Sequence, residues 1–122
     1  GNMAICFGGV EMPAPKLNGG LVETYEDVWS ADTGRNSAGR MMGTLVTTKA
    51  KLKFSWNALS WADAAKIKNA IYGAGFTTCT YPGVDGQDHT VSGYFGTPSF
   101  SQYSWQDGLR WATSITVDFI ER

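Results

Sequence analysis

The stretch VTTKAKLKFSW, from Val46 to Trp56, decides the fold because two kinds of residue alternate along it. Its even positions hold valine, threonine, alanine, leucine, phenylalanine and tryptophan, whereas three of its five odd positions are lysines. Side chains of a β-strand point alternately to opposite faces, so the pattern predicts a long strand with Leu52 and Phe54 on a core and the lysines facing outward. We expect this strand to begin as early as Arg40.

The segments that precede this strand predict a long hairpin and a short edge strand. Leu21 to Trp29 (LVETYEDVW) is rich in β-branched and aromatic residues, which favour a strand. Ser30 to Gly39 (SADTGRNSAG) holds only small, polar and turn residues, which predict a long, mobile loop at the hairpin tip. Ala4 to Met12 alternates weakly around two glycines and predicts one short edge strand, which ends at Pro13.

The residues from Ser60 to Gly75 change period and predict one helix. Ser60 is a suitable N-cap, and Asp63 follows three residues later. We expect Gly73 or Gly75 to end the helix. The residues on its apolar side are expected to be Trp61, Ala64, Ala65, Ile71 and Tyr72.

Two further hairpins complete the expected fold. One joins Phe76–Tyr81 to His89–Phe95, and the other joins Phe100–Gln106 to Leu109–Ile120 through Asp107-Gly108. The order of elements predicts a single domain, residues 1–122, of the α+β class and mainly β. Its architecture is expected to be a β-sandwich or a partly open barrel with a long hairpin and one flanking α-helix.

Composition argues against two classes of partner. The chain has 122 residues and a net charge of −1, with no Lys/Arg cluster of the kind that binds nucleic-acid phosphates. Its apolar runs all fall well short of the ~20 residues of a membrane span. We therefore expect neither sequence-specific nucleic-acid binding nor membrane insertion. Cys6 and Cys79 stand alone and predict buried free thiols, and Gly1 is interpreted as an added residue.

The residues that could carry chemistry do not form a recognisable active site. His89 is the single histidine, and its cluster with Asp85 and Asp88 lacks metal-ligand spacing, so we interpret it as a polar turn. Cys79 and His89 lie on facing strands, but nothing in the sequence indicates a thiolate or an oxyanion site. Glu23 and Asp27 fit a solvated strand face. We expect no enzymatic activity and no cofactor.

The tryptophans suggest a binding surface as one of several interpretations. Trp56 and Trp111 lie on apolar strand faces, as Trp61 does on the helix, whereas Trp29 and Trp105 border loops. A two-residue turn at Asp107-Gly108 would place three residues on one face, opposite Trp111: Tyr103, Trp105 and Arg110. Cross-strand packing, a protein interface and a sugar platform all remain open for this group.

Four stretches carry a resemblance to a known family. They are AICFGGVEMPAP (Ala4 to Pro15), LKFSWNALSWADAAKI (Leu52 to Ile67), CTYPGVDG (Cys79 to Gly86) and WATSITVDFIER (Trp111 to Arg122). With them the chain resembles small uncharacterised proteins encoded in tail gene clusters of siphophages and prophages of Gram-positive bacteria. The order of elements is also similar to the tail-tube and distal-tail fold. These motifs are structural, and no catalytic residue comes with the resemblance.

The resemblance implies a virion structural protein that forms a ring-type homo-oligomer with itself and binds other tail proteins. Its locations would be the virion and, during assembly, the host cytoplasm. We expect the interface to involve Asp32, Arg35 and Asn36 in the predicted loop, and Tyr103, Trp105 and Arg110. Lys49, Lys51 and Lys53 would face outward to solvent or meet acids of a neighbouring subunit. The alternatives are a carbohydrate-binding module and a head–tail joining or tail-terminating protein.

Overall fold

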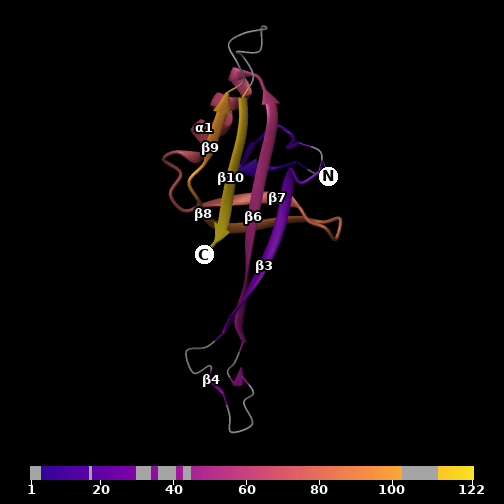
Figure 1. The fold of residues 1–122 in the computed structure, drawn as a ribbon, viewed down its shortest axis with the longest axis vertical. Helices are drawn as coiled ribbons and strands as arrows, with labels where there is room; N and C mark the ends of the chain where they lie inside the picture. The colour runs from indigo at the N-terminus through magenta and orange to yellow at the C-terminus, as the bar shows by residue number, and fades with distance from the viewer. Residues whose placement is uncertain (1–3, 17, 30–33, 36–40, 43–44, 103–112) are drawn as a thin grey trace.

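The computed structural model describes residues 4–16, 18–29, 34–35, 41–42, 45–102 and 113–122, which are mainly β with one helix (Figure 1). The α+β, mainly β prediction is confirmed. The elements follow in the order β1 (Cys6–Phe7), β2 (Val10–Glu11), β3 (Leu21–Trp29), β4 (Gly34–Arg35), β5 (Met41–Met42), β6 (Leu45–Leu59), α1 (Trp61–Ile71), β7 (Thr77–Pro82), β8 (Asp88–Phe95), β9 (Ser99–Gln102) and β10 (Thr113–Glu121).

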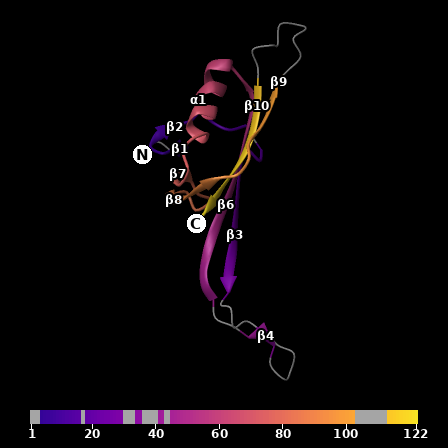
Figure 2. The same cartoon turned by 90° about the vertical axis from the view of Figure 1, so that its left-hand side faces the viewer.

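One antiparallel sheet, not closed into a barrel, holds eight of these strands in the order β2-β1-β7-β8-β10-β6-β3, with β9 also beside β10. In Figure 1, β7 and β8 run across the direction of β6 and β10. The sheet therefore folds over itself. Figure 2 shows α1, β1 and β7 on one side of the layer formed by β3, β6 and β10. The core lies between these two parts and draws on both.

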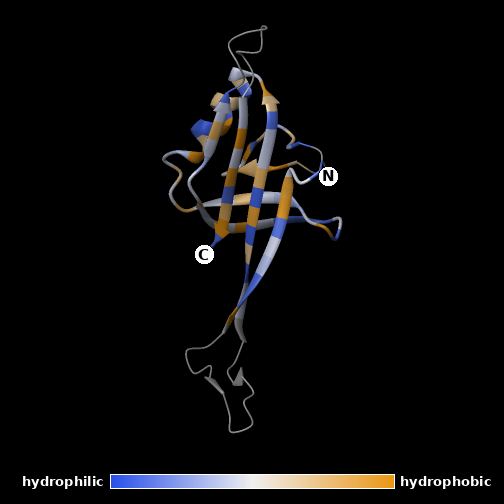
Figure 3. Ribbon diagram, viewed as in Figure 1, coloured by the Kyte–Doolittle hydropathy of each residue, from blue (hydrophilic) through white to orange (hydrophobic). Residues whose placement is uncertain are grey.

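The alternation along β6 is confirmed from Ala50 onward, whereas Thr48, predicted on the core face, is exposed. Leu52, Phe54 and Trp56 are buried, whereas Lys51 and Lys53, which precede Leu52 and Phe54, are exposed, and Figure 3 shows the change of hydropathy along the strand. The core-facing residues of β10 pack beside them, because Val117 pairs with Phe54 and Phe119 with Leu52. The odd position that departs from the pattern is Ser55, which is buried. Its backbone N–H donates to Gly20 and its carbonyl accepts from Lys16.

The corner of the sheet lies where β8 gives way to β9 along the same edge of β10. Phe95 pairs with Phe119 and Ser99 with Thr116, so residues 96–98 include one extra residue relative to β10. Such a bulge bends the strand that carries it. Gly93 stands just before the bend, and a β-carbon there would overlap the carbonyl oxygen of Ile120. The absence of a side chain at this position lets the two backbones cross closely.

Helix α1 begins and ends as predicted, but only two of the five residues predicted on its apolar side, Ala64 and Ile71, are buried. The Asp63 backbone N–H donates to Ser60 Oγ at 3.3 Å, and Gly73 follows the C-cap residue Tyr72 with a φ of +81°. The buried stripe is Ala64, Ile67 and Ile71, which repeats at three- and four-residue spacing.

Three of the five residues predicted on the buried face of α1 are exposed. Trp61 is exposed in the first turn and Ala65 lies about 100° around the helix from Ala64. Tyr72 has already left the helix, with an extended backbone that points its ring outward. The prediction was wrong for these three residues, and it omitted Ile67.

The N-terminal segment is a hairpin rather than the predicted single strand. β1 and β2 pair with each other across Gly8-Gly9, whose φ values of +59° and +84° are those of a tight primed turn. β1 also pairs with β7, so it lies inside the sheet, and β2 forms the edge.

The remaining predicted hairpins agree with the structure where it describes them. β7 and β8 pair from Thr77↔Gly93 to Pro82↔Asp88. β3 pairs with β6 along its whole length. Within the predicted loop 30–39, Gly34–Arg35 forms a short ladder with Met41–Met42, and β6 itself begins at Leu45 rather than Arg40. The predicted turn at Asp107-Gly108 lies outside the described residues.

Candidate functional site

Most residues of the predicted interface lie outside the part of the chain that the structure describes. These are Asp32, Asn36, Tyr103, Trp105 and Arg110. Arg35 is in β4, where it pairs with Met41 of β5. The proposed joint role of these six residues therefore stays a prediction, as do the roles of Trp29 and Trp111.

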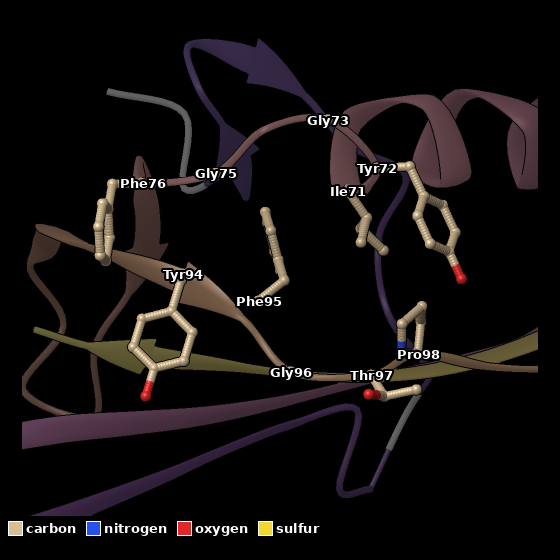
Figure 4. A pocket seen from close by; sticks show the side chains of 10 residues that line it. All are labelled: Ile71, Tyr72, Gly73, Gly75, Phe76, Tyr94, Phe95, Gly96, Thr97 and Pro98. Carbon is tan, nitrogen blue, oxygen red and sulfur yellow. The ribbon is translucent and has the colours of Figure 1, made fainter.

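An aromatic groove of about 520 Å³ lies between the end of α1 and the corner of the sheet (Figure 4). Two short segments form it: residues 71–76, which begin at the last residue of α1, and residues 94–98, which run from the end of β8 through the bulge before β9. None of the described residues that line it is charged. The lining residues are Ile71, Tyr72, Gly73, Gly75, Phe76, Tyr94, Phe95, Gly96, Thr97 and Pro98.

The rings of this groove are held in place by one another but remain open to solvent. Phe76 and Tyr94 meet edge to face with centroids 6.0 Å apart, and Tyr72 stacks on Phe100 at 6.4 Å. Phe76 is 64% exposed and Tyr72 56% exposed. The guanidinium of Arg122 lies 4.6 Å from the centre of the Phe76 ring. Exposed apolar surface gathered in a hollow, with a cation at its rim, is typical of a binding surface.

The sequence builds this groove from two aromatic segments interrupted by glycine. In YGAGF (residues 72–76), Gly73 and Gly75 both have positive φ, which turns the chain away from the helix, and neither glycine places a side chain in the hollow. In YFGTP (residues 94–98), Gly96 opens the bulge. Sequence reasoning missed the groove because it placed Tyr72 in the core. The clustering of aromatic residues around glycines in both segments was the signal available.

A second, polar hollow of about 470 Å³ lies between the β3–β6 pair and the β7–β8 hairpin. At its centre the Tyr25 hydroxyl donates to Glu23 Oε1 at 2.7 Å and lies 3.1 Å from the Tyr81 hydroxyl. Glu121 also lines the hollow, and its Oε1 accepts from the backbone N–H of Ala50 at 2.8 Å.

The two phenols of the polar hollow are held in their neutral form. The hydrogen bond with Tyr81, then burial, then the neighbouring Glu23 raise the pKa of Tyr25 far above its ordinary value. Burial is the main cause that raises the pKa of Tyr81. A phenol with a raised pKa is a poor base at neutral pH, so the pair is suited to holding strands together by hydrogen bonds.

The His89 cluster behaves as the predicted polar turn. His89 Nε2 lies 3.0 Å from both carboxylate oxygens of Asp85, and the Gln87 backbone N–H donates to the same carboxylate. The bond from His89 and then that from Gln87 lower the pKa of Asp85. Among the described residues, no group of three or more His, Cys, Asp or Glu side chains is arranged to hold a metal ion.

The two cysteines are free thiols, and the Cys79 thiol is inaccessible to solvent. Cys79 is fully buried, and burial raises its pKa to about 12, with a smaller contribution from Cys6. It pairs across β8 with Val91, whereas His89 pairs with Tyr81. Cys6 is only half-buried, which corrects the expectation that both thiols are buried. A thiol that stays protonated in the core cannot act as the nucleophile that the Cys79–His89 alternative required.

The lysine row lies on the outer face of β6, as expected. Cross-strand pairing places Glu26 of β3 opposite Lys49 and Asp118 of β10 opposite Lys53. The neighbours of Lys51 are Thr24 and Ile120. Acids of the same chain therefore already flank two of the three lysines.

Comparison with known proteins gives no relative: no family model, no curated protein and no solved structure matches the chain. Within the described residues, no helix has the length and apolar character that crossing a membrane requires.

Proposed function

We propose that the protein is a structural subunit of a phage or prophage tail, in the tube, distal-tail or baseplate region, and that it acts by self-assembly and not by catalysis. The observation that carries this proposal is the two-stranded ribbon formed by β3 and β6, which extends well beyond the folded sheet (Figures 1 and 2). The exposed side chains of this ribbon and the free edge of β3 suit contacts with other subunits better than they suit binding of a small ligand.

Among the residues that the structure describes, no layer packs on the outer part of this ribbon. We call it the arm, meaning residues 26–29 of β3 and 45–49 of β6. The arm side chains at 26–28 and 47–48 are all exposed, on both faces of the ribbon. A two-stranded ribbon without a packed face is at best marginally stable in water. An arm of this kind therefore gains stability when another subunit covers it.

The free edge of β3 supports the same proposal. Among the described residues, β3 pairs only with β6, so one row of its backbone N–H and C=O groups faces outward. Open strand edges are places where a second chain can add a strand. Heterologous contacts between edges and arms are the contacts that close rings of identical subunits.

The proposal is tested in purified tails or in co-expressed tail gene clusters. The protein should be present in many copies per particle, and two variants outside the described core should reduce its incorporation: Trp105→Ala and deletion of Asp32 to Ser37. Both variants should remain folded, which circular dichroism can check. Absence of the protein from purified particles would overturn the structural role.

Carbohydrate binding is the second candidate, and the aromatic groove is the observation that favours it. Tyr72, Phe76 and Tyr94 expose ring faces on which a sugar could stack. Saccharides of the host cell wall should then shift the ring proton signals of Phe76 and Tyr94 in NMR titrations, and Phe76→Ser should abolish the shifts. If no saccharide moves these signals, the groove is not a sugar site.

A further inference from the structure

We infer that the aromatic groove of one copy receives the arm of a second copy, with Val28 in the groove and Glu26 against Arg122. This inference rests on the proposed self-assembly and names the two surfaces that would meet. Among the described residues, no other segment covers either surface, and both are present in every copy, so the contact is head-to-tail.

Apolar surface is the first point of complementarity. Val28 is 37% exposed on the arm, on the face of β3 that points away from the core. The groove offers a hollow of about 520 Å³ lined by aromatic rings, Ile71 and Pro98, with no charged side chain in it. Burying an aliphatic side chain among aromatic rings removes apolar area from water on both partners.

Charge is the second point of complementarity. Arg122 lies at the rim of the groove, against Phe76. Glu26 is the carboxylate on the outer face of the arm, where Lys49 lies opposite it, whereas Asp27 lies on the other face. Glu26 shares the outer face of β3 with Val28, two residues away, which corresponds to about 7 Å along a strand. An acid at this distance can reach a cation at the rim while the valine occupies the hollow.

The arm and the groove belong to different parts of the molecule. The arm leads away from the folded sheet, whereas the groove lies at the corner between β8, β9 and the end of α1 (Figures 1 and 4). One copy can therefore use both surfaces at the same time with two different neighbours. Repetition of the contact would produce a closed ring or an open chain, depending on its rotation.

Complementary substitutions in the full-length protein test the inference. Val28→Lys removes the arm surface and leaves the groove, whereas Phe76→Ser with Arg122→Glu removes the groove and leaves the arm. Each variant alone should raise the dissociation constant of self-association, measured by sedimentation, by about tenfold or more. An equal mixture of the two should form heterodimers and stop there, because only one intact contact remains possible.

Matched controls separate this contact from general surface effects. Val22 lies on the same face of β3 and is 42% exposed, but it lies beside the folded sheet, so Val22→Lys should associate like the wild type. Val84→Ser, in the turn between β7 and β8, is the control for Phe76→Ser. Glu26→Arg should weaken association, and Arg122→Glu in the same chain should restore it.

Three results would overturn the inference: a wild-type protein that stays monomeric at the highest soluble concentration, variants that associate like their controls, or a mixture that grows beyond dimers. These results differ from a failure of the proposed function. If the contact forms in solution but the protein is absent from purified tails, the tail role is wrong and the contact stands. If the variants enter tails normally, the contact is wrong and the tail role stands.

Discussion

The hydroxyl oxygens of Tyr25 on β3 and Tyr81 on β7 lie 3.1 Å apart, although 56 positions separate the two residues in the chain. β3 is the edge of the sheet and β7 belongs to the part that folds over it, so this bond joins the two layers beside the point where the arm leaves. Glu23 completes the group by accepting from Tyr25.

Tyr25→Phe should lower the free energy of unfolding by about 0.5–1.5 kcal/mol, because it removes the partly buried hydrogen bond with Tyr81 and the exposed one with Glu23 and leaves the ring in place. Urea unfolding measures this loss. Tyr94→Phe is the matched control, since its ring is exposed in the groove, and it should change stability by less than about 0.5 kcal/mol. Equal losses in the two variants would contradict a stabilising role for the Tyr25–Tyr81 pair.

The same pair predicts how stability depends on alkaline pH. The pKa of each phenol is raised in the folded protein above the ordinary value of 10.0. The folded state therefore keeps protons that the unfolded state releases, and the contribution is fully present below pH 10 and falls as the pH rises beyond it. Thermal unfolding between pH 8 and about 11 should show this fall in the wild type and a shallower fall in Tyr25→Phe. A rise in stability above pH 10 would contradict the prediction.

The alternation along β6 predicts a large loss of stability for substitution at one position and a small loss at the next. Phe54→Ala should cost about 3–5 kcal/mol, because Phe54 is fully buried between Phe7 and Trp56. Lys53→Ala should cost no more than about 0.5 kcal/mol, because that side chain is exposed on the opposite face. Chemical denaturation of both variants measures the difference, and similar losses would mean that the two faces are assigned wrongly.

The geometry at the corner of the sheet predicts that alanine substitution destabilises the protein strongly at Gly93 and only weakly at Gly96. At Gly93 a β-carbon overlaps the Ile120 backbone, so Gly93→Ala should destabilise the protein by about 1–3 kcal/mol or prevent folding. At Gly96 the nearest atom is the Asp118 β-carbon at 3.6 Å, an ordinary contact. Gly96→Ala should therefore fold with near wild-type stability in the same thermal melts, and the reverse order would show that the crossing is misplaced.

The thiols of Cys6 and Cys79 should differ in their reactivity toward a disulfide reagent. A disulfide reagent at pH 8 should modify Cys6 first, whereas Cys79 should react only when the protein unfolds, because it is buried and its pKa is about 12. Absorbance of the released thiolate measures both steps, with Cys6→Ser and Cys79→Ser to assign them. Rapid modification of two thiols in the folded protein would contradict the burial of Cys79.

Local patterns were enough to predict much of the fold. The alternation at Leu52 and Phe54 has a period of two, and Ser60 offers a capping oxygen to the helix, so neighbouring residues decide these features. Which helix residues face the core was harder to predict. Trp61 is apolar but exposed in the first turn, and Tyr72 lies past the last turn. The Gly8-Gly9 turn carried a hairpin signal in its dipeptide, but the strands on either side have only two residues each.

The sequence shows the two aromatic segments of the candidate site but not that they meet, because they lie far apart along the chain. The groove needs the end of α1 to lie beside the bulge after Phe95, and that bulge exists only relative to β10. The Tyr25–Tyr81 bond likewise depends on how the sheet folds over. Ala58 adopts a φ of +53° within β6, next to a register shift against β10, and nothing in its local sequence indicates this.

The position of β10 has a consequence for the order in which the chain can fold. β10 lies between β6 on one side and β8 and β9 on the other, yet it is the last of the described strands along the chain. During synthesis, β6 and the β7–β8 hairpin leave the ribosome before the strand that joins them. Their inner edges must stay apart from each other and from other nascent chains until residues 113–121 arrive. The pairing of β10 with β6 joins positions that lie far apart in the chain, so folding should be slow for a chain of this length. Where nascent copies are crowded together, their unpaired strand edges should favour mispairing between neighbouring copies.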